Sequence, residues 1–346
     1  MAFSRTLLCL LATILVIGGF VAPARADAAA DWKLYKERFV ADDGRVVDTA
    51  NGGISHSEGQ GYGLILALAN DDPGTFARIW TWTRSMLLIR DDGLLAWRYD
   101  PKAKSAITDI NAATDGDVLV AYALLMASVR WSQPTYAEQA RTHIEAIRKA
   151  AVREVAGYAV LLPGPQGFER PEGVVLNPSY WVFPAFQAFP ALDDDPVWST
   201  LVDDGRQLIE RANETFGLPP DWMLLKKEGG VDLPKGFEKV SGYNALRVPL
   251  YGAWGRLDPQ IFLRPFAKYW TEAEKEFPTV ITLPSEVVAD RSPDPAYQAL
   301  RRLVLCALKQ KPDFPFPPLS PQSDYYPASL LLLAEQVSLT VYPQCQ

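Results

Sequence analysis

The chain has 346 residues, of which 48% are hydrophobic and 22% are charged. This composition supplies a large buried core and is not that of a disordered chain. Lys and Arg number 34 against 41 Asp and Glu, a net charge of -7, so we expect no nucleic-acid partner. The only histidines are His56 and His143, which argues against a His-rich metal site and weakens any Ser-His-Asp scheme. Carboxylate chemistry remains open, and it needs neither a metal nor another cofactor.

The first 26 residues have the pattern of a secretory signal peptide. Arg5 precedes an apolar run from Leu7 to Val21, and Ala24-Arg25-Ala26 has the small-x-small form of a cleavage site. The run covers 15 residues, fewer than the roughly 20 that a membrane-spanning helix needs. We therefore expect residues 1–26 to be removed. The mature chain, 27–346, is expected to be secreted, periplasmic or extracellular, without a membrane segment.

Two cysteines remain after that cleavage, Cys306 and Cys345. An oxidising compartment permits a disulfide between them. Cys306 also lies in an apolar helical run and is equally explained as a core residue, so the pattern leaves both alternatives open.

Apolar residues recur at helical spacing along most of the chain, while strand-like alternation is rare and short. Capping side chains before a proline mark several helix starts, such as Asp72-Pro73 and Asp258-Pro259. The expected helices are Asp31–Val40, Ser57–Ala69, Pro73–Leu88, Thr114–Trp131, Thr135–Val155, Pro178–Ala188, Val197–Glu214, Gly242–Trp254, Pro259–Glu276, Pro295–Lys309 and Tyr325–Leu339. Because no connector resembles an interdomain linker, the pattern predicts one all-α domain. Antiparallel helix pairs of this number can close into a toroid of six hairpins.

Two segments carry candidate catalytic carboxylates. The first, Ser57-Glu58-Gly59-Gln60-Gly61-Tyr62-Gly63, is unusually rich in glycine for a helix start and places Glu58 in the first turn, where acids are also favoured simply by the helix dipole. The second runs from Thr108 to Asp117 and places Asp109, Asp115 and Asp117 just ahead of an apolar helix. One of these acids is expected to serve only as a cap. An EF-hand is excluded because its twelfth position would be Val120 or Met126 instead of Glu.

These motifs resemble those of glycoside hydrolase family 8. The stretch Ala113-Thr114-Asp115-Gly116-Asp117, followed by Ala121, Ala123, Ala127 and Trp131, is similar to the family signature, and the Glu58 segment is similar to its acid-bearing helix start. Further matches lie at Asn177-Pro178-Ser179-Tyr180 and at 243–249, so the resemblance covers most of the mature chain. Within the family, the chain most resembles the periplasmic endo-β-1,4-glucanases that accompany bacterial cellulose synthases. The resemblance implies a six-hairpin (α/α) barrel, which agrees with the helix pattern.

The resemblance also implies roles for individual residues. Glu58 corresponds to the general acid that protonates the leaving glycosidic oxygen. Asp115 corresponds to a second cleft carboxylate that holds the sugar in a distorted ring shape, and its negative charge near Glu58 would raise the pKa of that acid. Trp97 resembles a ring that stacks on glucose, although a core tryptophan would explain it too. Tyr180 and Arg247 resemble cleft residues.

The chain departs from the family at the position of the base. Many members carry Asp where this chain has Asn244, and an amide cannot take a proton from water at neutral pH, although it can hold water by hydrogen bonding. The candidates for a displaced base are Asp115 itself, or Glu228, Asp232 or Glu238 from the preceding loop. The residues do not decide among them.

Two classes of function follow. The first is an inverting endo-hydrolase whose substrate is a β-1,4-glucan chain, cellulose or a cello-oligosaccharide, with a functional link to a cellulose synthase complex. The second is a glucan-binding protein that has kept the cleft and lost its base. A chitosanase or xylanase on the same scaffold is a further alternative.

Overall fold

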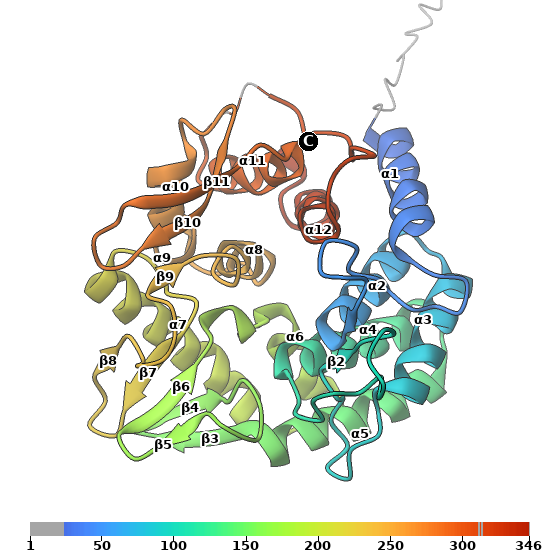
Figure 1. Cartoon of the computed structure of the whole chain (residues 1–346), viewed down its shortest axis with the longest axis horizontal. Helices are drawn as coiled ribbons and strands as arrows, with labels where there is room; N and C mark the ends of the chain where they lie inside the picture. The colour runs from blue at the N-terminus through green and yellow to red at the C-terminus, as the bar shows by residue number, and fades with distance from the viewer. Residues whose placement is uncertain (1–23, 311, 313, 346) are drawn as a thin grey trace, which may run out of the picture.

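The computed structural model describes residues 24–310, 312 and 314–345, and within them twelve α-helices form a closed ring (Figure 1). Five helices lie nearest the centre: α2 (Ser57–Ala69), α4 (Thr114–Arg130), α6 (Phe183–Ala188), α8 (Arg247–Trp254) and α12 (Tyr325–Val341). The others are α1 (Ala24–Phe39), α3 (Pro73–Met86), α5 (Pro134–Ala151), α7 (Val197–Phe216), α9 (Pro259–Phe262), α10 (Arg264–Trp270) and α11 (Gln298–Ala307). The predicted helical barrel is confirmed.

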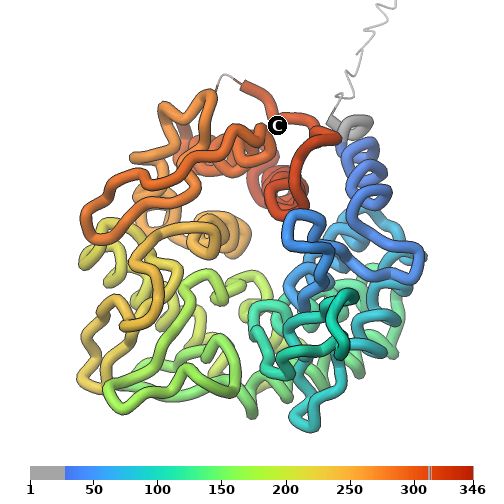
Figure 2. The backbone as a smooth tube through the Cα atoms, in the orientation of Figure 1, coloured from blue at the N-terminus to red at the C-terminus, as the bar shows by residue number. Residues whose placement is uncertain are grey.

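The chain travels once around the ring and closes where α1 meets α12 (Figure 2). At this closure the hydroxyls of Tyr35 and Ser329 form a buried hydrogen bond of 2.9 Å. The first and last described helices therefore complete the same core.

The innermost helices are buried on nearly every side, which explains their continuous apolar sequence. Glycines let α2 and α4 approach closely. A β-carbon at Gly61 would lie 2.6 Å from Cβ of Leu119, and one at Gly116 would lie 2.5 Å from the main-chain nitrogen of Glu58. This close packing brings the starts of the two helices, and so Glu58 and Asp115, together.

Eleven short strands form four antiparallel sheets in the described part of the chain. Strands β1 (Ser55–His56) and β2 (Arg98–Tyr99) pair beside the start of α2. The other sheets contain β3 (Val152–Val155) with β4 (Tyr158–Leu161); β5 (Glu169–Arg170), β6 (Gly173–Leu176), β7 (Met223–Lys226) and β8 (Val231–Asp232); and β9 (Val240–Ser241), β10 (Phe277–Thr282) and β11 (Val288–Ser292). They lie in the connections between helices and leave the helical ring intact.

Several predicted helix boundaries are wrong. The helix expected to reach Val155 ends at Ala151, because residues 152–155 form a hairpin with β4 through Ala156 and Gly157, both of which have positive φ. The helix expected from Gly242 begins only at Arg247, and the one expected to reach Glu276 ends at Trp270. The helix expected from Pro178 is interrupted after the 3-10 turn η1 (Pro178–Tyr180). By contrast, the range predicted for α2 is confirmed.

Cys306 and Cys345 form a disulfide, with their Cα atoms 5.7 Å apart, which ties α11 to the end of the chain. Of the two alternatives for this pair, the disulfide is therefore the one observed. Residues 1–23 of the predicted signal peptide lie outside the described residues. None of the helices described here combines the length and apolar character required to cross a membrane.

Candidate active site

The candidate site lies at one end of the ring, where the inner helices begin. Glu58 is the second residue of α2, Asp115 the second of α4, Arg247 the first of α8 and Tyr326 the second of α12. Each of these inner helices therefore directs its N-terminal end, with its partial positive charge, toward the same region. These helix ends act on an acidic side chain in the direction opposite to burial, because they favour its ionised form.

Two adjoining cavities of about 590 and 220 Å³ form a cleft there. Both are lined by Asn51, Glu58, Asn244 and Arg247. The smaller also contains Trp97, Asp115 and Tyr180, and the larger adds the carboxylates Asp48, Asp294 and Asp324 and the rings Tyr243, Tyr297 and Tyr326. All six residues predicted for the site thus line one cleft.

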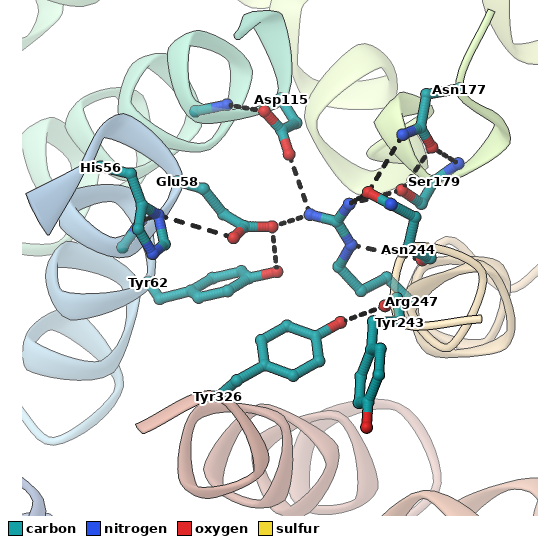
Figure 3. Close-up of polar contacts among 12 residues, drawn as sticks. His56, Glu58, Tyr62, Asp115, Asn177, Ser179, Tyr243, Asn244, Arg247 and Tyr326 are labelled. Carbon is teal, nitrogen blue, oxygen red and sulfur yellow. Dashed lines mark hydrogen bonds and ion pairs between the residues drawn. The ribbon is translucent and has the colours of Figure 1, made fainter. Parts of the chain in front are cut away.

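Arg247 joins the two candidate carboxylates (Figure 3). Its Nη1 contacts Oε1 of Glu58 and lies 2.9 Å from Oδ2 of Asp115. Its Nη2 donates at 2.7 Å to Ser179 Oγ and at 2.7 Å to Asn244 Oδ1. Arg247, which is only 3% exposed, is therefore held by four side chains.

Glu58 has two further neighbours. The hydroxyl of Tyr62 donates to Oε1 at 3.1 Å, and Nδ1 of His56 lies 3.7 Å from Oε2. Because His56 Nδ1 accepts the main-chain N–H of Gly59 at 3.0 Å, the ring proton of neutral His56 belongs on Nε2, which lies 3.6 Å from Asp48 Oδ2. Oε1 of Glu58 thus contacts a cation and a hydroxyl, while Oε2 faces an imidazole.

Asp115 is 2% exposed, and its surroundings are correspondingly dry. Burial raises the pKa of Asp115 to about 7. The N–H of Gly116, which donates to Oδ1 at 2.8 Å, acts to lower this pKa, and the nearby charge of Asp117 acts to raise it. The hydroxyl of Tyr180 also bonds to this carboxylate. The negative charge of Asp115 does not face Glu58 alone, as the sequence suggested, because Arg247 contacts both groups.

Asn244 has a fixed environment of its own. Its Oδ1 accepts hydrogen bonds from Arg247 at 2.7 Å and from Asn177 Nδ2 at 3.1 Å, and its Nδ2 lies 3.4 Å from Asp221 Oδ2. Both lone pairs of the amide oxygen are therefore used. Asn244 can donate to a ligand in the cleft but has no acceptor left for the proton of a water molecule.

Three of the four acids considered as a displaced base do not line the cleft. Glu228, Asp232 and Glu238 are exposed in and around the β7–β8 region, and Asp232 pairs instead with Lys226 at 2.9 Å. Asp115 is the only one of the four in the cleft.

Trp97 is half-buried, lines the smaller cavity and donates its ring N–H to Asp109 at 2.8 Å. This bond fixes the ring orientation, so Trp97 is not simply a core residue.

Sequence reasoning missed several residues that organise the site: Tyr62, Asn177, Ser179 and Asp221. Ser179 lies in a matched family motif, and Tyr62 follows Glu58 by one helical turn, so both had a local signal. Asp221 had none, because it reaches Asn244 from a loop more than twenty residues earlier.

Among the described residues, no group of three or more His, Cys, Asp or Glu side chains is arranged to hold a metal ion.

The chain is similar to several known proteins. A family model described as glycosyl hydrolases family 8 matches residues 9–335. An endoglucanase of Cellulomonas uda is 39% identical over 76% of this chain and 73% of its own, and a probable endoglucanase of Novacetimonas hansenii is 34% identical over 91% and 92%. The crystal structure of a family 8 endoglucanase from Klebsiella pneumoniae superposes with a TM-score of 0.83 at 36% identity, covering 90% of this chain and 99% of that one.

Proposed function

The chain belongs to glycoside hydrolase family 8, and from this membership we propose that it cleaves internal bonds of β-1,4-glucan chains such as soluble or amorphous cellulose. One observation carries the proposal: the carboxylates of Glu58 and Asp115 both contact Arg247, in a cleft whose larger cavity, of about 590 Å³, can hold sugar rings. The names of the relatives support the substrate class. Hydrolysis of a glycosidic bond requires a pair of carboxyl groups and a water molecule.

Glu58 is the general acid in this proposal. It reaches the cleft from the first turn of α2, and its Oε1 contacts Arg247 when no sugar is bound. The arginine favours the ionised form, so a substrate has to displace that contact before Glu58 carries the proton for the leaving oxygen. The hydroxyl of Tyr62 holds the carboxyl group in place during this exchange.

Asp115 holds the sugar and does not activate the water. An oxygen of each carboxylate contacts the same nitrogen, so the two oxygens lie less than about 6 Å apart. Inverting enzymes separate acid and base by roughly 6.5–9.5 Å to admit a water molecule. We therefore assign the water's proton to one of the other carboxylates of the cleft, Asp48, Asp294 or Asp324.

The test of the proposed function is hydrolysis of carboxymethylcellulose by the purified chain. An endo-acting enzyme lowers the viscosity of the solution faster than it releases reducing ends. Replacing Asp48, Asp294 and Asp324 one at a time by Asn, with and without azide, then identifies the base, since azide replaces water as nucleophile without needing a base. Wild-type protein that releases no reducing ends contradicts the proposal.

A catalytically impaired glucan-binding protein is the second candidate. It is favoured by the amide at position 244, whose oxygen already accepts two hydrogen bonds. Such a protein would be retarded on a cellulose gel yet release no sugar from it.

We further propose that the chain is exported and works beside a cellulose synthase complex. The signal-like N-terminus and the disulfide between Cys306 and Cys345 support an oxidising compartment. Fractionation of the source cells tests the location, because a cytoplasmic pool of full-length, reduced protein would contradict it.

A further inference from the structure

Asp221 is a buried carboxylate next to the cleft residue Asn244. It is 8% exposed, and its Oδ1 accepts the main-chain N–H groups of Gly242 at 2.8 Å and Ala245 at 2.9 Å. Its Oδ2 lies 3.4 Å from Nδ2 of Asn244. One side chain thus holds the turn before α8 on both sides of Asn244 and also contacts its amide.

The contacts of Asn244 determine which way its amide faces. Arg247 has only donors, so Nη2 requires the amide oxygen. Asn177 also presents a donor, because its own Oδ1 accepts both the N–H and the hydroxyl of Ser179, at 3.0 and 2.7 Å. Two donors therefore meet Oδ1 of Asn244, and the NH2 group faces Asp221, which as a carboxylate offers only acceptors.

We propose that Asp221 is a positioning residue of the reaction, acting through Asn244 and Arg247. By fixing the amide of Asn244 with its oxygen toward Arg247, it holds the guanidinium group that contacts both Glu58 and Asp115. The inference rests on the proposed hydrolysis. Asp221 itself does not line the cleft, so its effect reaches the sugar only through these neighbours.

Replacing Asp221 by Asn reverses one hydrogen bond and preserves the rest. The new oxygen can still accept from Gly242 and Ala245, but its NH2 group faces the NH2 group of Asn244, donor against donor. The repulsion between the two NH2 groups then displaces the amide of Asn244, and Arg247 loses a fixed acceptor. A misplacement of catalytic groups by about 1 Å costs up to roughly 100-fold in rate.

The exchange Asp221→Asn with Asn244→Asp restores every donor and acceptor. The carboxylate introduced by Asn244→Asp would accept from Arg247, from Asn177 and from the new amide at position 221. The single change Asn244→Asp, in contrast, places two carboxylates together, which must share a proton or repel.

Asp204 offers a matched control. It is 9% exposed, accepts the main-chain N–H of Ala159 at 2.7 Å and the side-chain amide of Gln207 at 3.4 Å, and does not line the cleft. Asp204→Asn therefore reports the effect of removing a buried, hydrogen-bonded carboxylate without touching the site.

The experiment measures kcat and KM on cellohexaose and the Tm for the wild type, Asp221→Asn, Asn244→Asp, the exchange and Asp204→Asn. Asp221→Asn should lower kcat about tenfold or more while KM stays within threefold. The exchange should return kcat to within threefold of the wild type or above it. Asp204→Asn should lower Tm and leave kcat within twofold.

The inference is overturned if Asp221→Asn leaves kcat within twofold of the wild type, or if the exchange is no more active than Asp221→Asn. If the wild type itself releases no sugar, the proposed hydrolysis fails, and Tm alone decides the positioning. The exchange should then recover more than half of the summed Tm losses of the two single variants. Additive losses would contradict the pairing.

Discussion

Nη1 of Arg247 lies 2.9 Å from Oδ2 of Asp115, and the same nitrogen contacts Glu58. Both Arg247 and Asp115 are buried, so this pair is shielded from water in a region where charges interact strongly. The arginine is the common neighbour through which the two acids influence each other.

Arg247→Lys should therefore impair the enzyme severely despite keeping the charge. A lysine has one ammonium group and cannot reach Glu58, Asp115, Ser179 and Asn244 together. We expect kcat/KM to fall about 100-fold or more and Tm to fall by several degrees. Arg206→Lys, at a partly exposed ion pair with Glu210, is the control and should change neither quantity appreciably.

Glu58→Gln should retain oligosaccharide binding and lose hydrolysis. The amide keeps the shape of the side chain but has no acidic proton to donate, and general acid catalysis contributes roughly 10²–10⁴-fold. Calorimetric titration with cellohexaose measures binding, and reducing-end release measures turnover. Turnover within threefold of the wild type would remove Glu58 from the mechanism, and Glu37→Gln, at an exposed helix position, provides the comparison.

Asp115→Asn should lower kcat by about 100-fold or more, because the amide cannot pair with Arg247 as a charged group or hold the sugar in the same way. If Asp115 served only the helix start, Asn would replace it with little loss, since the two residues cap helices almost equally well. Full activity with an unchanged Tm would therefore favour the structural role.

The same variant should change the dependence of stability on pH. The pKa of Asp115, raised by burial to about 7 in the folded chain, is about 3.9 in the unfolded one, so between these values the folded chain binds the proton more tightly. The contribution of this group is fully present below about pH 4 and is lost as pH rises through about 7. Relative to the wild type, the Tm of Asp115→Asn should rise by several degrees from pH 4 to pH 8, and a constant difference would contradict the raised pKa.

Removing the disulfide should lower stability and leave catalysis alone. The bond joins residues 39 apart in the chain, and loops of this length correspond to about 2–4 kcal/mol. Cys306→Ser with Cys345→Ser should therefore lower the denaturant midpoint while kcat stays within twofold. Since neither cysteine lines the cleft, a large fall in kcat would contradict the separation of the two regions.

The ring of helices was predictable because helical periodicity is a local pattern, and the six residues that line the cleft were named from the family resemblance. The start of α2, with Glu58 in its first turn, combines helical periodicity with a family motif, and its range was correct. The errors have two different causes. Residues 152–155 pair with 158–161 in a tight hairpin and do not continue the helix. Gly242–Leu246 form an irregular turn that is held by the distant residue Asp221. No local pattern marks Asp221, since its partners follow it by more than twenty residues.

The position of Arg247 between Glu58 and Asp115 was equally hidden from the sequence. The resemblance placed all three in the cleft, but only the packing of α2, α4 and α8 brings one nitrogen into contact with both acids. Under the proposed inverting reaction, this contact places Asp115 closer to Glu58 than the spacing expected of a base.

The most direct test of the account is the configuration of the first product. Proton NMR of cellohexaose during the first minutes of hydrolysis, before mutarotation, distinguishes the two anomers. An inverting reaction, with Glu58 as acid and water activated by a carboxylate more than about 6 Å away, predicts the α-anomer first. Initial formation of the β-anomer would contradict the account. It would indicate a retaining reaction, in which a carboxylate close to Glu58, such as that of Asp115, forms a covalent intermediate.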